Sequence, residues 1–201
     1  ATYRLMDDLR AAHPHLEIES CSSGGARVDL GVLERTDRVW VSDCIDPHER
    51  QQMLRWTTQL VPPEMMGSHI ASGTSHTTGR SHDLDFRAAT AVFGHLGVEW
   101  DLRRATAEEL AELAGWIAFH KAHRGLLFGG DLVRIDSPDG TLIAAGVIAP
   151  DRSAAIYSFA SVAAPITASR GRLRLPGLDP SRRYRVSPVL VGRVPSGLHL
   201  P

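Results

Sequence analysis

Cysteine, long apolar runs and an excess of charge of one sign are scarce or missing in this sequence. Only two cysteines occur among its 201 residues, too few for the disulfide framework of a small secreted protein, so we expect a reducing, cytoplasmic location. No apolar run approaches the roughly 20 residues that a membrane span needs. The net charge of −1 provides no basic surface for nucleic acid. We therefore expect neither a membrane nor nucleic acid as a partner.

Motifs for several common chemistries are also missing. Gly24-Gly25 is not followed by the Lys-Ser/Thr pair of a phosphate loop, and no GxSxG elbow occurs. The ten histidines fit neither HExxH nor a Cys-His zinc pattern, so we expect no metal and no organic cofactor. The sequence also lacks an initiator methionine and opens within a helical pattern, and we expect it to be a piece of a longer protein.

The sequence does contain a regular succession of short apolar strands and helical segments. Helical spacing covers residues 2–12 and 28–35, and strand-like runs cover 16–20 and 38–42. A further helix should run to about residue 60, because Asp46 is a good N-cap and Pro47 suits the first helical position. Such alternation is typical of parallel β/α units, whose strands need helical crossovers.

The character of the chain changes after residue 129. Before that point we expect a loop rich in Gly, Ser, Thr and His at 64–82 and helices at 83–93 and 106–124, the last one closed by Arg124-Gly125. After it, Pro, Gly and Asp separate five β-type runs: residues 132–135, 141–148, 156–159, 172–175 and 184–191. We therefore divide the chain into a β/α domain, 1–129, and a small antiparallel β domain, 130–201.

The two strands at 16–20 and 38–42 both end abruptly in small and polar residues. The stretch ESCSSGGARVD begins at Glu19, and the stretch WVSDCID begins at Trp40. In parallel β/α folds the carboxyl ends of the strands carry the ligand-binding residues. Small residues there leave room for a ligand, and glycines allow the backbone to approach it closely. We expect a binding site where these two segments meet.

Several blocks occur in an order and at a spacing that resemble a known family. Between about Tyr3 and Leu102 the chain contains ESCSSGGARVDLG, RVWVSDCIDPHERQQ, VPPEMMGSHI and LDFRAATAVFGHLGVEW. This pattern resembles the last third of a retaining α-galactosidase of glycoside hydrolase family 36. The resemblance implies an α/β fold. It would be the last part of a (β/α)8 TIM barrel, with its last two strands, followed by a small antiparallel β-sandwich-like domain.

The resemblance also implies a substrate-binding set. Cys21 matches a cysteine that lines the galactose pocket, and Ser23 and Gly24 belong to a loop whose backbone contacts the sugar. Ser23 stands where the family usually has glycine. Arg27 lies in the same block without a defined role, and Trp40 is the one tryptophan near this site. For Cys21 and Trp40, the alternative to a role in substrate binding is ordinary packing in the protein core.

Asp43 matches the general acid/base of the family. A retaining glycosidase needs two carboxyl groups about 5 Å apart, one as nucleophile and one as acid/base. The alternative for Asp43 is a helix cap or a surface aspartate, although Asp46 already occupies the capping position. The family's nucleophile lies in a Lys-Trp-Asp block on an earlier strand, and no such block occurs here. We therefore expect the missing N-terminal part of the same protein to supply it, and the chain alone to be inactive.

The implied function is hydrolysis of terminal α-galactosyl groups from an α-galactoside oligosaccharide by double displacement. Two alternatives stay open: galactosyl transfer to a sugar, as raffinose or stachyose synthases perform it, and a carbohydrate-binding remnant without catalysis. The exposed strand edges of an incomplete barrel favour association, so a homo-oligomer is a further expectation. A disulfide between Cys21 and Cys44 is also left open.

Overall fold

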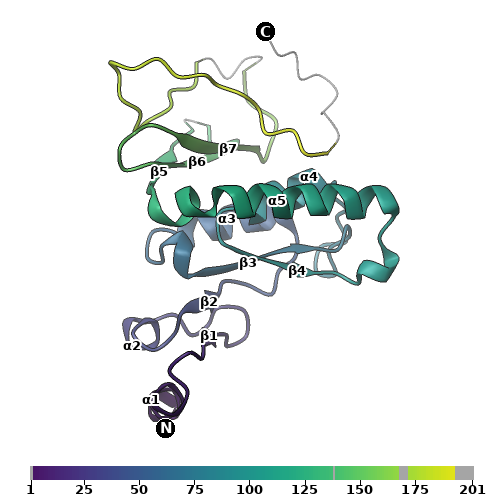
Figure 1. Cartoon of the computed structure of the whole chain (residues 1–201). Helices are drawn as coiled ribbons and strands as arrows, with labels where there is room; N and C mark the ends of the chain where they lie inside the picture. Colours follow the sequence, from purple (N-terminus) through teal and green to yellow (C-terminus); the bar gives the residue numbers. More distant parts are fainter. Residues whose placement is uncertain (1, 138, 168–171, 193–201) are drawn as a thin grey trace.

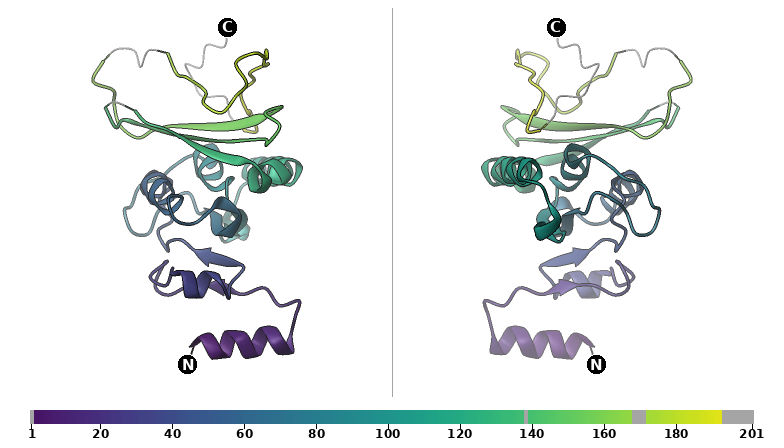
Figure 2. Two further views of the ribbon diagram at one scale, coloured as in Figure 1. Left: turned by 90° about the vertical axis from the view of Figure 1, so that its left-hand side faces the viewer. Right: turned by 90° about the vertical axis from the view of Figure 1, so that its right-hand side faces the viewer.

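A computed structural model describes residues 2–137, 139–167 and 172–192 of the chain. Its elements form three layers, in which a parallel sheet, a set of helices and an antiparallel sheet are stacked in that order (Figure 1). Two further views show that the antiparallel sheet and the helix α1 (Thr2–Ala12) lie at opposite ends of this stack (Figure 2). Only the middle set of helices therefore lies between the two sheets, and α1 lies outside it.

Four strands build the parallel sheet, and they follow one another both in sequence and in space. They are β1 (Glu19–Ser20), β2 (Arg38–Trp40), β3 (Met66–Ala71) and β4 (His95–Glu99), paired in the order β1-β2-β3-β4. The crossovers contain α2 (Leu30–Leu33), α3 (Pro47–Thr57) and α4 (Leu84–Ala91), and α5 (Ala107–Gly129) follows β4. The expected segment of a barrel is confirmed, but the expectation of only two strands was wrong.

The prediction of a loop over 64–82 was wrong in its first part. The short 3-10 helix η1 (Pro63–Met65) leads directly into β3, whose six residues are all buried. A parallel strand covered on both faces shows no apolar–polar alternation, and Gly67, Ser68 and His69 gave this one a loop-like composition. Residues 72–82 do form a connection that ends at α4. We call this connection the His-rich loop.

Two other elements differ from the sequence prediction. β4 was not predicted, because Gly94 and Gly97 interrupt its apolar pattern. After β4 and the 3-10 helix η2 (Leu102–Arg104), α5 does not end near Arg124 but continues to Gly129. Its last turns are kept helical by packing, since Leu127 is 1% exposed and the ring of Phe128 lies 4.6 Å from that of His95. Tertiary contacts here override a local end signal.

The antiparallel sheet contains three strands, β5 (Asp131–Ile135), β6 (Leu142–Ile148) and β7 (Ala155–Ser161), in the order β5-β6-β7. The strands predicted at 172–175 and 184–191 are absent from the described range 172–192. Pro188 in the second run cannot donate to a sheet ladder. The described residues of this region thus form one three-stranded antiparallel sheet, which confirms the expected antiparallel β region after the barrel segment. The domain boundary near Gly129-Gly130 stays a prediction, although α5 ends and β5 begins there.

The helix layer supplies the hydrophobic core on both of its sides. Towards the parallel sheet, one cluster of buried residues consists of Ile70, Leu84, Ala88, Ala91, Leu113 and Trp116, and a second consists of Val39, Val61 and Met66. On the other side, α3 and α5 contact β6. Within the three described ranges no helix is both long and apolar enough to cross a membrane.

Candidate active site at the ends of the parallel strands

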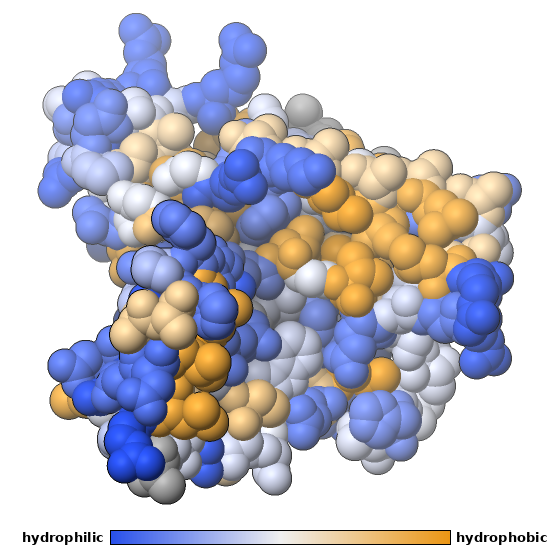
Figure 3. Space-filling view, turned by 60° about the horizontal axis from the view of Figure 1, so that its bottom comes forward, coloured by the Kyte–Doolittle hydropathy of each residue, from blue (hydrophilic) through white to orange (hydrophobic). Residues whose placement is uncertain are grey.

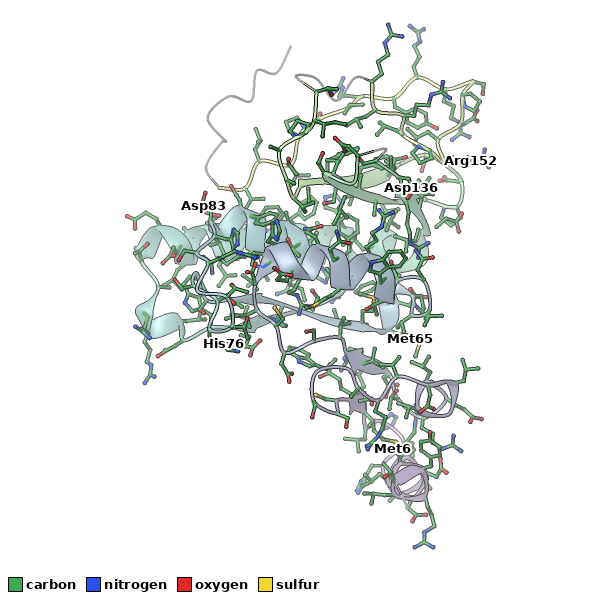
Figure 4. The ribbon with its side chains drawn as sticks, turned by 180° about the vertical axis from the view of Figure 1, so that it is seen from behind. Met6, Met65, His76, Asp83, Asp136 and Arg152 are labelled. Carbon is green, nitrogen blue, oxygen red and sulfur yellow. The ribbon has the colours of Figure 1, made fainter. Side chains whose placement is uncertain are left out.

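The segments that follow β1 and β2 lie together at the carboxyl edge of the parallel sheet. Ser20 pairs with Val39, so the glycine loop (residues 22–26) and the Asp43 segment (residues 42–46) leave the sheet as neighbours. Met65 and His76, labelled in Figure 4, mark the two ends of β3, and the His-rich loop lies at the end marked by His76. The three connections share one edge because the strands are parallel.

The glycine loop is a tight turn with an unusual backbone. The amide of Ala26 donates to the carbonyl of Ser22 at 2.9 Å. The three residues between them, Ser23, Gly24 and Gly25, have φ angles of 50°, 65° and 91°. Such left-handed conformations cost little for glycine and more for other residues. Ser23 adopts one of them although the resemblance places a glycine at this position.

Gly24 and Gly25 also allow the glycine loop to pack against the Asp43 segment. A Cβ on Gly24 would lie 2.8 Å from the backbone nitrogen of Asp43 and 3.2 Å from its Oδ2. A Cβ on Gly25 would overlap the carbonyl oxygen of Val41. The two glycines are therefore needed for contact as well as for conformation, and the loop forms one wall beside the Asp43 carboxylate.

Asp43 is exposed, and its carboxylate is oriented by Trp40. Nε1 of Trp40 donates to Oδ1 of Asp43 at 3.0 Å. The indole is stacked on the ring of His69, with centroids 4.6 Å apart and an interplanar angle of 15°. Gly67 leaves space for the indole, because a Cβ there would lie 3.2 Å from it. The indole is thus fixed by β3 and in turn fixes the direction of the carboxylate.

His69 is a buried, neutral histidine on the face of the sheet that Trp40 occupies. Burial, together with the positive charge of Arg50, lowers the pKa of His69 to about 3. Its Nε2 lies 3.0 Å from Oε2 of Glu99. This contact does not have hydrogen-bond geometry, and Nε2 has no other hydrogen-bond partner among the described residues. We treat this pair as a polar contact and not as an ion pair, since an uncharged imidazole carries no charge to pair.

Asp46 fixes the far end of the Asp43 segment. Its carboxylate is completely buried and caps α3, with Oδ1 accepting from the amide of His48 at 2.9 Å. Oδ2 accepts from Thr78 at 2.6 Å and from Arg80 at 3.0 Å, both in the His-rich loop. Burial alone would raise the pKa of Asp46, but the hydrogen bonds from Thr78 and His48 and the charge of Arg80 lower it below its usual value. The expected capping role of Asp46 is confirmed, and it also joins two connections.

The remaining predicted residues lie on the glycine loop or close to it. Cys21 and Ser23 are exposed, and the carbonyl of Arg27 accepts a hydrogen bond from Ser20 at 3.0 Å. The structure therefore brings Gly24, Trp40 and Asp43 into contact and places Cys21 and Ser23 beside them. Their roles towards a sugar stay predictions.

The two cysteines are both free thiols. Cys44 lies 3.9 Å from the hydroxyl of Thr77. Within the described part of the chain, no group of three or more His, Cys, Asp or Glu side chains could hold a metal ion. The cytoplasmic location stays a prediction.

Two hollows accompany the parallel sheet. A small apolar hollow of about 70 Å³ lies between α3, α4 and the antiparallel sheet. It is smaller than the roughly 150 Å³ cavity that accepts benzene, so it is no site for a sugar. A larger hollow of about 860 Å³ is lined by strand residues that include Glu19, Trp40 and Gly67 and by one face of α5. Trp40 thus belongs both to this open side of the sheet and to the carboxylate at its edge.

Sequence and structure comparisons agree on the family. Residues 1–130 match the family described as Melibiase, and residues 142–200 match the glycosyl hydrolase family 36 C-terminal domain. The chain belongs to the melibiase family. This melibiase-family chain is similar to an alpha-galactosidase of Escherichia coli, with 43% identity over 184 residues, which are 92% of this chain and 26% of the relative.

Solved structures give the same result. The chain is similar to the crystal structure of an alpha-galactosidase from Lactobacillus brevis, with a TM-score of 0.87 and 35% identity over 92% of this chain and 25% of that one. It is also similar to an alpha-galactosidase variant from Geobacillus stearothermophilus solved in complex with raffinose, with a TM-score of 0.80 and 33% identity over 89% of this chain and 25% of that one. The melibiase-family chain thus spans about a quarter of the length of the relatives it matches.

Proposed function

We propose that this chain forms the acid/base side of a retaining α-galactosidase that removes terminal α-galactosyl groups from oligosaccharides. The observation that carries the proposal is the placement of Asp43. Its carboxylate is exposed at the carboxyl edge of a parallel sheet, is oriented by Trp40 and is flanked by Gly24. The family and the names of the relatives support a galactoside as substrate, and the raffinose complex of a structural neighbour supports an oligosaccharide.

Asp43 acts in both halves of the proposed reaction. Its protonated carboxyl group donates a proton to the leaving glycosidic oxygen while a second carboxylate attacks the anomeric carbon. The ionised Asp43 then removes a proton from the water that cleaves the glycosyl–enzyme bond. Trp40 holds Oδ1, so Oδ2, the oxygen that faces Gly24, is the one that we assign to proton transfer.

We assign the nucleophile to a part of the complete protein outside these residues. The relatives are about four times as long as this chain, and no Lys-Trp-Asp block occurs in it. In Figure 3, where the lower side of the molecule is turned forward, apolar side chains reach the surface over a broad area. Exposed apolar residues on β4, η2 and the first turn of α5 include Val98, Leu102 and Leu110. Such a surface suits coverage by further polypeptide, and we expect the isolated chain to be inactive.

The proposal is tested by Asp43→Ala in the complete protein, with two aryl α-galactosides as substrates. For phenyl galactoside, whose leaving group needs a proton, kcat/KM should fall by about 10²–10⁴-fold. For dinitrophenyl galactoside, whose leaving group needs none, kcat/KM should fall much less. Azide, a nucleophile that requires no base, should restore turnover of the dinitrophenyl substrate.

Near wild-type rates with both substrates would show that Asp43 is not the acid/base. Product analysis with raffinose separates the alternatives. Free galactose indicates hydrolysis, longer oligosaccharides indicate galactosyl transfer, and binding without products indicates a carbohydrate-binding protein.

A further inference from the structure

Arg50 is a buried arginine on α3, seven residues after Asp43, and the proposed chemistry does not use it. It is 2% exposed. Its Nη1 donates to the carbonyl of Ser42 and to the carbonyl of Cys44, each at 3.1 Å. These two carbonyls flank Asp43 in the chain. One guanidinium nitrogen therefore holds the peptide group before Asp43 and the peptide group after Cys44.

The surroundings of Arg50 are costly for stability. Burial lowers the pKa of its guanidinium, and among the described residues Nε and Nη2 have no hydrogen-bond partner. No Asp or Glu carboxylate in the described ranges lies within ion-pair distance of it. A buried charge that is neither paired nor fully hydrogen-bonded costs free energy. The free-energy cost of burying Arg50 has an explanation if its two hydrogen bonds, to the carbonyls of Ser42 and Cys44, keep the Asp43 segment in position.

Arg87 shows what a more ordinary buried arginine looks like in the same layer. It is 3% exposed, lies on α4 and donates to the carbonyl of Ala71 at the end of β3. In contrast to Arg50, it approaches a carboxylate, with Nη2 3.8 Å from Oε1 of Glu109. The two arginines match in burial and in helix placement, and they differ in which strand end they hold.

We propose that Arg50 is a positioning residue for Asp43, a role that rests on the proposed function of Asp43 as acid/base. Holding the carbonyls of Ser42 and Cys44 restricts the backbone dihedral angles of the two residues between them, Asp43 and Cys44, and hence the direction in which the Asp43 side chain leaves the backbone. Trp40 restricts the carboxylate at the other end of the side chain. Both restraints are needed, because a misplacement of about 1 Å can cost about 10²-fold in rate.

The test compares Arg50→Met, Arg50→Lys and Arg87→Met in the complete protein. Met fills similar space without a donor, and the Lys ammonium lies one bond short of the Nη1 position. With Arg50→Met, kcat/KM for phenyl α-galactoside should fall at least ten times more than kcat/KM for the dinitrophenyl substrate. Arg50→Lys should give a smaller change in the same direction. Arg87→Met should alter stability, while the ratio of kcat/KM for the phenyl substrate to kcat/KM for the dinitrophenyl substrate should stay at its wild-type level.

Two results would overturn the role of Arg50: an unchanged ratio of the two kcat/KM values in both Arg50 variants, whether or not both values fall, or the same shift of this ratio in Arg87→Met. Hydrogen exchange gives an independent measurement. Amides of residues 42–46 should exchange faster in Arg50→Lys than in the wild type, and unchanged exchange would also overturn it. If the wild-type protein hydrolyses neither galactoside, the proposed function has failed, while hydrogen exchange still decides whether Arg50 holds this segment.

Discussion

The two sheets of this chain bury different kinds of side chain. In and beside the parallel sheet, buried polar residues include Ser20, Asp46, Arg50, Ser68 and His69. In β6, the central strand of the antiparallel sheet, the buried residues are Leu142, Ile143, Ala144, Gly146, Val147 and Ile148. Burying polar groups costs free energy unless each finds a partner, whereas burying apolar groups is favourable by itself. The antiparallel sheet therefore follows the pattern that stability alone favours, and the parallel sheet departs from it.

The departure is concentrated where the strand connections meet. Asp46 joins α3 to the His-rich loop, Arg50 holds two carbonyls of the Asp43 segment, and His69 supports the indole of Trp40. These contacts are directional, whereas the packing of β6 is not. Changes near the parallel strand ends should therefore act mainly on catalytic rates. Changes in β6 should act mainly on stability.

The largest effect is expected on the stability side of this comparison. Ile148 is 2% exposed in β6, and Ile148→Ala should lower the free energy of unfolding by about 2–5 kcal/mol, because it creates a cavity in an apolar contact. Calorimetry of the complete protein measures the loss. At temperatures where the variant is folded, kcat/KM for both aryl galactosides should match the wild type. A fall in kcat/KM of tenfold or more would break the comparison, since it would couple the antiparallel sheet to catalysis.

The next effect is expected on the catalytic side. Gly24→Ala would place a Cβ 2.8 Å from the backbone nitrogen of Asp43, so the Asp43 segment must shift, and kcat/KM for phenyl galactoside should fall by about 100-fold. Gly79→Ala is a matched control, since Gly79 has a similar φ of 71° and a Cβ added there would meet no atom within 4 Å. Steady-state kinetics of the two variants should separate backbone strain from displacement of Asp43. Equal activities would show that the glycine loop does not position this residue.

The smallest effect concerns the pH dependence of stability. The pKa of His69 is about 3 in the folded chain and about 6.5 when unfolded. Between these values the unfolded state binds the proton and the folded state does not, so the free energy of unfolding decreases as the pH falls from 6.5 towards 3. The contribution is at most about 1.4 kcal/mol per pH unit. His69→Phe, which can still stack on Trp40, should show a correspondingly shallower fall in denaturant titrations from pH 6.5 to 4.5. Identical slopes would show that His69 does not titrate in this way.

Much of the fold follows from local signals in the sequence. The cap formed by Asp46 marks the start of α3 and is confirmed. The expected start of a helix at residue 106 is also confirmed, because Thr106 and Glu109 form a capping box at the start of α5. β3 was missed because a strand buried on both faces lacks alternation, and Gly67-Ser68 resembles a turn. The far end of α5 is determined by packing of Leu127, which no local signal reports.

The site could be predicted only in part. Asp43, Trp40 and Gly24 could be singled out because they lie at or just after strand ends in blocks that resemble the family, and the structure brings them together. Arg50 and His69 stand in the same blocks, but their contacts are to backbone carbonyls and to an aromatic ring. Spacing along the chain does not reveal such contacts. They emerge only when neighbouring strands and α3 are placed side by side.

The central claim is that Asp43 is held at the edge of the parallel sheet as the acid/base of a retaining glycosidase. A crystal structure of the complete protein with a bound, non-hydrolysable α-galactoside tests it most directly. We predict Oδ2 of Asp43 within hydrogen-bond distance of the glycosidic oxygen and a second carboxylate about 5–5.5 Å away, across the anomeric carbon. A galactoside bound elsewhere, or a carboxylate of Asp43 turned away from it, would contradict the account.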